Sequence, residues 1–313
     1  MRMHECISDY IEYRQGLGEK VRTIKYILLA FNRYVGLDVG MDDVSVEQCS
    51  EYLYTKGRRN QIITSYWFSI YVVIDGLYNW AITRGYTINN PLPRNKPQKP
   101  ESFKPYIYSK EELCKIFDTA LSYRKRFNIV YPQSIQVMLK LTYCLGLRPS
   151  EVIALCIDDI DIDNAILLIK ETKFYKSRML PFSDKVLKLL KEYLVWRKKL
   201  TYNYPQYNNY MFINKKGGQL KLSTLQEAFR AICKESDICR KGYYNVRLQD
   251  LRHTFATNRV TQWYEQGEDV QKLLPLLSTY MGHCNIDSTS VYICITGKLL
   301  EKASLMFKNY VDL

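Results

Sequence analysis

The sequence predicts a mainly α-helical fold with a small β-sheet, divided between a helical N-terminal domain and a larger α+β domain. Apolar residues recur at three- and four-residue intervals over most of the 313 residues, as they do on the buried face of a helix. One stretch, 157–181, is rich instead in strand-forming residues. A proline-rich segment at 91–105 separates two portions, and the chain is long enough for two packed cores.

Residues 1–90 are predicted to form consecutive helices with polar joints, because the helical spacing is clear in 21–31 and again in 62–82. These helices carry cations among aromatic residues. Such an arrangement can follow a DNA backbone, although solvated basic helix faces are also common. The candidate DNA contacts in this domain are Arg22, Lys25, Arg58 and Arg59.

The segment 91–105 contains five prolines and several cations. Because proline resists helix formation, the sequence predicts an extended linker and places the domain boundary here. A basic strap could lie along the phosphates of a duplex, whereas an ordinary linker would have the same composition. Its candidate DNA contacts are Arg94, Lys96 and Lys99.

The second domain, predicted over 106–313, begins with three helix signals. A Ser-x-x-Glu capping box opens a helix over 109–122. A helix at roughly 133–145 ends at Gly146, and Pro149 is suited to the first turn of the next helix. Each of these three helices therefore has a signal at one of its ends.

A hairpin and further helices follow. Residues 165–170 read as a buried strand, and 179–181 form the return strand after a polar turn at 172–178. From about 183 the chain is mainly helical, and the apolar residues between 299 and 306 predict a final amphipathic helix.

Charge and cysteine usage narrow the class of protein. With 45 Lys+Arg against 32 Asp+Glu, the net charge is +13, which favours nucleic acid as a partner and leaves acidic membranes and other anions as alternatives. No stretch approaches the ~20 apolar residues of a spanning helix, and no apolar signal core follows the N-terminus. The nine cysteines form no C-x-x-C pair, so we expect small buried thiols in a cytoplasmic protein.

Four separated segments carry residues suited to phosphate chemistry. They are CLGLRPSEV at 144–152, TKFYKSR at 172–178, LQDLRHTFAT at 248–257 and YMGHCNIDSTSVY at 280–292. In order and spacing they resemble the catalytic domain of the tyrosine recombinase, or phage-integrase, family. The resemblance covers about 140–300, while residues 1–90 have only a general likeness to the family's helical core-binding domain.

The resemblance implies that Arg148 and Arg252 hold the scissile phosphate, because a guanidinium can bind two non-bridging oxygens of the transition state. Glu151 matches the acidic residue that orients the first arginine. His283 would hydrogen-bond the phosphate, and Tyr292, selected among 27 tyrosines by its interval from Gly-His, would attack it. Taken alone, an arginine at a helix end more often satisfies backbone carbonyls.

Three further residues concern proton transfer. Lys173, at the start of the hairpin turn, would protonate the 5′ leaving oxygen. Lys176 competes for that role and, with Arg178, is also a candidate DNA contact. Gln249 stands where the family usually has histidine, sometimes lysine. Glutamine can donate a hydrogen bond but cannot exchange a proton near neutral pH, so general-base help for Tyr292 is in doubt. His253 is predicted to be a packed helix residue.

The implied chemistry is a transesterification without metal or cofactor, in which the tyrosine displaces a 5′-hydroxyl and forms a 3′-phosphotyrosyl link. The implied partners are double-stranded DNA with specific recombination sites, three further copies in a tetramer on two sites, and companion recombinases. Two alternatives stay open: a DNA-binding protein of the same fold that cannot cleave, and a type IB topoisomerase-like enzyme. The run 263–270 resembles the longer loops of transposon-encoded members.

Overall fold

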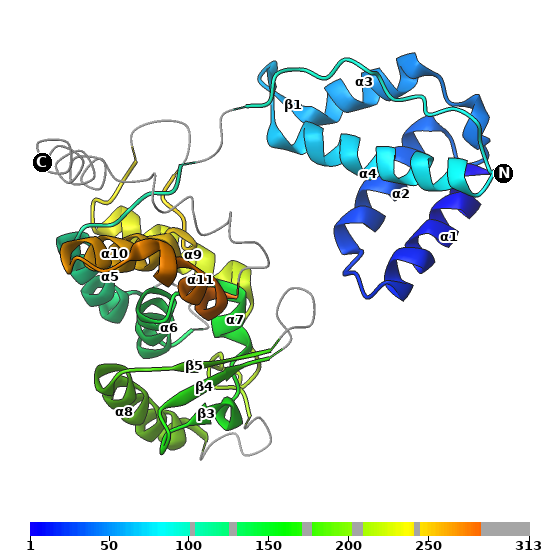
Figure 1. Cartoon of the computed structure of the whole chain (residues 1–313). Helices are drawn as coiled ribbons and strands as arrows, with labels where there is room; N and C mark the ends of the chain where they lie inside the picture. The colour runs from blue at the N-terminus through cyan, green and yellow to red at the C-terminus, as the bar shows by residue number, and fades with distance from the viewer. Residues whose placement is uncertain (101–103, 125–129, 171–176, 202–208, 241–244, 283–313) are drawn as a thin grey trace, which may run out of the picture. The chain divides into compact units, whose positions relative to one another are not determined.

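The computed structural model describes residues 1–100, 104–124, 130–170, 177–201, 209–240 and 245–282. The chain forms two compact units, Met1–Phe103 and Lys104–Leu313. Figure 1 shows the helices and strands of both units. Each unit has its own core, and the two cores share no residue. No helix in the described part of the chain combines the length and apolar character that crossing a membrane requires.

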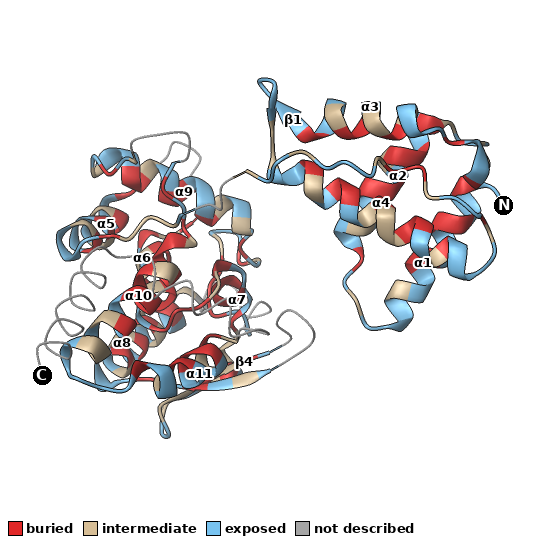
Figure 2. Cartoon of the chain, turned by 45° about the horizontal axis from the view of Figure 1, so that its top comes forward, coloured by how far each residue is buried: buried red, intermediate tan, exposed pale blue. Residues whose placement is uncertain are grey.

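The first unit consists mainly of helices whose apolar faces enclose one core (Figure 2). Its larger elements are α1 (Met3–Gly16), α2 (Arg22–Val35), the 3-10 turn η1 (Met41–Asp43), α3 (Val46–Gly57) and α4 (Ser65–Thr83). Phe31 of α2 and Trp67 and Tyr78 of α4 are fully buried among them. The helical nature predicted for this portion is therefore confirmed.

A short hairpin within this unit was not predicted. Strands β1 (Arg58–Arg59) and β2 (Ile62–Ile63) pair antiparallel, with Arg59 opposite Ile62. The two linking residues, Asn60 and Gln61, have φ angles of 49° and 62°, as a tight two-residue turn requires. The expected helix over 62–82 therefore starts only at Ser65. An Asn-Gln pair lacks the glycine by which such turns are usually recognised in a sequence.

The start of the proline-rich segment packs on the first unit and is not a free linker. Leu92 is buried in the helical core. The Tyr71 hydroxyl donates a hydrogen bond to the Pro93 carbonyl at 3.1 Å, and the Lys96 ammonium lies 4.2 Å from the centre of the Tyr71 ring. The chain therefore leaves this unit later than the first proline.

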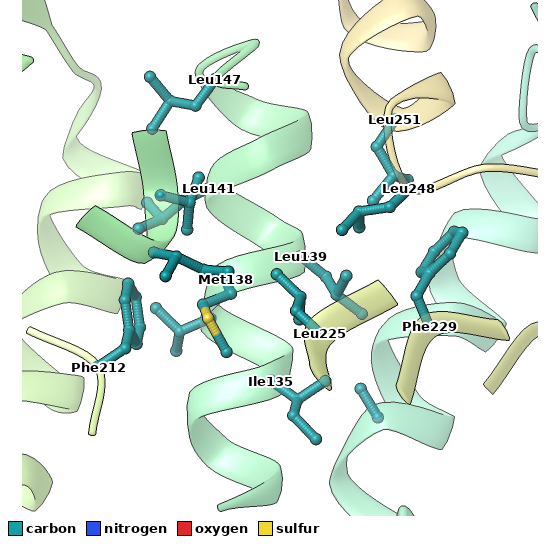
Figure 3. Close-up of a cluster of buried hydrophobic side chains, with 14 of the residues drawn as sticks. Ile135, Met138, Leu139, Leu141, Leu147, Phe212, Leu225, Phe229, Leu248 and Leu251 are labelled. Carbon is teal, nitrogen blue, oxygen red and sulfur yellow. The ribbon is translucent and has the colours of Figure 1, made fainter. Parts of the chain in front are cut away.

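The second unit is built around α6 (Pro132–Cys144), whose Ile135, Met138 and Leu139 are fully buried (Figure 3). The other elements are α5 (Lys110–Ser122), α7 (Pro149–Ala154), the 3-10 turn η2 (Ile157–Asp159), β3 (Ile160–Asp161), β4 (Ile166–Ile169), β5 (Arg178–Pro181), α8 (Asp184–Thr201), α9 (Leu222–Glu235), α10 (Asp250–Glu265) and α11 (Val270–Met281). The capping box predicted before α5 is present, because the Ser109 hydroxyl accepts from the Glu112 amide at 3.2 Å.

The predicted hairpin is the main part of an antiparallel sheet with the order β3–β4–β5. Leu167 of β4 lies opposite Leu180 of β5, and both are fully buried. The turn that joins these strands, including Lys173 and Lys176, lies outside the described residues.

The connection between α10 and α11 corrects the expectation of a long loop at 263–270. Residues 263–265 complete α10, α11 begins at Val270, and only four residues link the two helices. Gly267, with φ of 73°, allows the sharp reversal. Phe255 and Val260 of α10 then pack with apolar residues of α11 in a small separate core.

The expectation that the cysteines are buried is wrong for several of them. Among the cysteines that the structure describes, Cys6, Cys49 and Cys233 are buried, whereas Cys114, Cys144 and Cys239 are exposed. On α5, for example, Leu113 and Ile116 face the core while Cys114 occupies an outward position. An apolar neighbourhood in the sequence does not by itself place a residue on the inward face of a helix.

Candidate functional site

The candidate phosphate site brings together the ends of four elements of the second unit. Arg148 precedes the first turn of α7, Arg178 begins β5, Arg252 lies in the first turn of α10, and Gly282 follows α11. Residues 29 to 134 positions apart in the sequence thus meet. Lys173, Lys176, His283 and Tyr292 lie outside the described residues.

Glu151 is the centre of a buried charge network. Its carboxylate accepts hydrogen bonds from the Arg148 amide at 2.9 Å and from Arg148 Nη1 at 2.7 Å. Arg178 donates to both oxygens of the same carboxylate, from Nη1 at 3.0 Å and from Nη2 at 2.8 Å. A carboxylate has about four acceptor sites, so these contacts use its full capacity.

The network keeps Glu151 ionised. Its side chain is only 5% exposed, and burial alone would raise the pKa of this carboxyl. The hydrogen bonds and charge of Arg178, followed by those of Arg148, outweigh burial and lower the pKa to about 2. The sequence suggested that Arg178 contacts DNA, but here its guanidinium, with 11% of the side chain exposed, is paired with Glu151.

Arginines also hold three successive carbonyls at the end of α11. Arg178 Nε donates to the Tyr280 carbonyl at 2.9 Å. Arg252 Nη2 donates to the Met281 carbonyl at 2.7 Å, and Arg148 Nη2 donates to the Gly282 carbonyl at 2.8 Å. The last turn of α11, directly before His283 in sequence, is therefore tied to β5, α10 and α7.

Two glycines make this close approach possible. Gly146, whose carbonyl accepts from Arg252, has φ of 58°, and an added Cβ would collide with the Phe255 ring. Gly282 has φ of 68°, and an added Cβ would lie 2.8 Å from Nη1 of Arg178. A side chain at either position would strain the backbone and displace the site.

Gln249 and His253 differ in their surroundings. Gln249 is half-buried directly before α10, and no described residue hydrogen-bonds its side-chain amide. His253 is also half-buried, one residue after Arg252. Burial lowers the pKa of His253 to about 4, opposed by Asp250 and assisted by Arg247 and Arg252. His253 is therefore neutral at pH 7.

The charge of the site favours an anion. Arg148, Arg178, Arg247 and Arg252 gather here against two carboxylates, Glu151 and Asp250. Asp250 is fully buried and accepts from the Arg247 side chain at 2.9 Å. Within the described ranges, no group of three or more His, Cys, Asp or Glu side chains could hold a metal ion.

The cations suggested as DNA contacts in the first unit are exposed: Arg22, Lys25, Arg58, Arg59, Arg94, Lys96 and Lys99. Sequence reasoning missed a hollow of about 470 Å³ between α2, α3 and the start of α4. Tyr26, Tyr66, Arg33 and Lys56 line it, and no acidic residue does. The recurrence of cations and tyrosines at positions 26, 33 and 34 of one helix was the available signal.

A second hollow, of about 710 Å³, opens on the second unit between α6, α10, α11 and the start of α8. Its walls are mainly apolar and aromatic and include Phe182, Trp263 and Leu276, the last of which is 64% exposed. An exposed apolar surface of this kind is typical of a site that another protein segment covers.

Comparison with known proteins places these features in context. The family model described as "Phage integrase family" matches residues 110–297. A putative integrase/recombinase of Sinorhizobium fredii, y4rB, is 29% identical over 304 residues, which span 96% of this chain and 95% of that protein. Tyrosine recombinase XerC of Staphylococcus saprophyticus is 26% identical over 255 residues, 81% of this chain and 77% of that protein.

Solved structures share the fold. The XerH site-specific recombinase bound to its palindromic difH substrate after cleavage has a TM-score of 0.68 at 20% identity, covering 92% of this chain and 80% of that one. The Tn1549 transposon integrase in complex with transposon right-end DNA has a TM-score of 0.69 at 14% identity, with 99% of both chains covered.

Proposed function

The chain belongs to the phage integrase family and is a site-specific tyrosine recombinase, and we propose that Tyr292 is the nucleophile with which it breaks and rejoins DNA strands. The single observation that carries this proposal is the meeting of Arg148 and Arg252 at the last turn of α11. Tyr292 follows that turn by ten residues in the sequence.

In the proposed reaction, the two arginines bind non-bridging oxygens of the scissile phosphate. Their charge stabilises the additional negative charge of the pentacoordinate transition state. Glu151 acts through Arg148, whose backbone and guanidinium it holds. His283 donates a hydrogen bond to the same phosphate.

Proton transfer completes the reaction. Lys173 protonates the 5′ oxygen as it leaves, with Lys176 as the competing candidate. The Tyr292 oxygen forms a bond to phosphorus while the bond to the 5′ oxygen breaks, which leaves a 3′-phosphotyrosyl link. Gln249 orients the phosphate by hydrogen bonding and does not take the tyrosine proton. That proton passes to solvent water as the Tyr292 oxygen attacks phosphorus.

We further propose that the enzyme acts as a tetramer on two recombination sites, alone or with companion recombinases. Structural relatives include a lambda integrase tetramer bound to a Holliday junction. The apolar hollow beside α11 supports this assembly, because it can receive an apolar helix face from a neighbouring copy. The segment 299–306 has the amphipathic sequence expected of such a helix.

The wild-type protein is first used to select its binding site from a library of randomised duplexes. A nicked duplex that carries this site then tests the nucleophile. We expect a covalent protein–DNA adduct that resists denaturing electrophoresis, and we expect Tyr292→Phe to abolish it while site affinity stays unchanged. Gln249→His should speed adduct formation if the missing base limits the rate. Site binding without any adduct from the wild type would favour the non-cleaving alternative.

A further inference from the structure

We propose that Arg178 is a positioning residue for recombination: by pairing with Glu151 and with the Tyr280 carbonyl, it sets the positions of Arg148 and of the last turn of α11. This inference rests on the proposed function, because Arg148 is proposed to bind the scissile phosphate. Neither the family match nor the sequence motifs assign this role to Arg178.

The geometry of the Arg178 guanidinium suits it to hold two elements at once. A guanidinium has five N–H groups in a fixed plane. Arg178 uses three of its nitrogens at once, two on the two oxygens of Glu151 and Nε on the Tyr280 carbonyl at 2.9 Å. One rigid group therefore fixes the distance between the start of α7 and the end of α11. A lysine ammonium could not span both partners with the same geometry.

Glu151 depends on Arg178 to stay ionised while it holds Arg148. Its carboxylate holds Arg148 through the backbone amide and through Nη1. Two described charged groups, the Arg148 and Arg178 guanidinium groups, contact this buried carboxylate. Of these two side chains, only that of Arg178 donates to both carboxylate oxygens. Without Arg178, a buried carboxylate would lose half of its hydrogen bonds and would take up a proton more readily.

Arg178 is also less exposed than Arg148. Only 11% of the Arg178 side chain is exposed, whereas Arg148 keeps 25% of its side chain open. A residue whose main role is to bind a DNA phosphate would present its guanidinium to solvent. Arg178 instead presents it to the protein interior, and Gly282 leaves just enough room for it.

The test compares Arg178→Met with Arg178→Lys, and uses Arg230→Met, an exposed arginine on α9, as the matched control. At saturating DNA we expect Arg178→Met to slow adduct formation by about 10–100-fold, as a displaced catalytic group does. The dissociation constant and its salt dependence should stay unchanged. Arg178→Lys should recover part of the rate, and Arg230→Met should match the wild type.

Acid titration gives a readout that needs no DNA. Arg178→Met should unfold in acid at a higher pH than the wild type, because Glu151 then takes up its proton at a higher pH. Adding Glu151→Gln should remove that shift and should make the double variant more stable than Arg178→Met alone. This comparison also tests the proposal if the single variant folds poorly, since the double variant contains no buried carboxylate that has lost Arg178.

Two results would overturn the proposal. If Arg178→Met weakens site binding and lowers the salt slope by about one while the rate at saturation holds, then Arg178 is a DNA contact. If neither the rate of adduct formation nor the pH of acid unfolding changes, the pairing of Arg178 with Glu151 contributes to neither catalysis nor stability. Absence of any adduct with wild-type protein would count against the Tyr292 assignment, whereas the acid titration would still judge Arg178.

Discussion

Glu151 and His253 show how two side chains at one site respond to acid in different windows. Glu151 has a pKa of about 2 in the folded protein, well below its ordinary value of 4.5. His253 has a pKa of about 4, below its ordinary value of 6.5. In both cases the unfolded chain binds a proton at a pH where the folded protein does not. Stability therefore falls as the pH falls through each window.

We predict that acid destabilises the second unit in two stages. Between pH 6.5 and 4 the loss comes from His253, and between pH 4.5 and 2 it comes from Glu151 and reaches about 3 kcal/mol. Urea unfolding of the wild type and of Glu151→Gln at a series of pH values measures this. The glutamine variant should be less stable at pH 7, and its stability should be flatter below pH 4.5.

The turn between α6 and α7 positions the carbonyl that holds Arg252. Gly146 occupies the left-handed region there and lies against the Phe255 ring of α10. Gly267, between α10 and α11, has a similar φ of 73° but has nothing within 4 Å of an added Cβ. An alanine at either position would therefore have similar backbone strain, but only the alanine at 146 would collide with a neighbouring side chain.

We predict that Gly146→Ala costs clearly more stability than Gly267→Ala. The common strain is about 1–2 kcal/mol, and the collision with Phe255 adds about 1–3 kcal/mol at Gly146 alone. Chemical denaturation of both variants gives the difference. Equal losses would mean that the Phe255 ring moves aside without cost.

The elements with strong local signals were predictable from the sequence. The α5 capping box, the Pro149 start of α7 and the β4–β5 hairpin appear where the sequence places them. The β1–β2 turn was not, because Asn60 and Gln61 adopt positive φ without glycine. The resemblance to transposon-encoded members also overestimated how far residues 263–270 depart from helix, since 263–265 belong to α10 and the chain reverses sharply at Gly267.

The same limit applies to the candidate site. Motif spacing selected Arg148, Glu151 and Arg252 as candidate site residues, because they lie in segments with a recognisable pattern. The pairing of Arg178 with Glu151 joins residues 27 positions apart, and no local pattern encodes such a contact. The tyrosine and arginine side chains around Lys56 were missed because three separate helices supply them.

Separate cores define how the whole chain should unfold. The first unit buries residues between Met3 and Leu92, and the second buries its own set from Tyr108 onward. We therefore predict two calorimetric transitions in the full chain. Substitution of Trp67, a fully buried residue of the first unit, by alanine should lower only one of them. A single transition that moves as a whole would mean that the units unfold together.

DNA binding should depend on the first unit through the hollow that Arg33 and Lys56 line. We predict that Arg33→Met combined with Lys56→Met weakens binding to any duplex and lowers the slope of log affinity against log salt by about two. Anisotropy titrations between low and moderate salt measure this slope. Lys272→Met, a cation with an 83% exposed side chain on α11, is the control and should leave the slope unchanged.

The arginines at the end of α11 are engaged with backbone carbonyls before any DNA arrives. If Arg148 and Arg252 bind the scissile phosphate as we propose, that phosphate competes with the Met281 and Gly282 carbonyls for them. Linkage between the two contacts is reciprocal: a phosphate that takes an arginine weakens its hold on the last turn of α11, and any contact that draws this turn away raises the affinity for phosphate. In the tetramer that we propose, such an exchange would make an unassembled copy a weak catalyst and would restrict strand cleavage to the assembled complex.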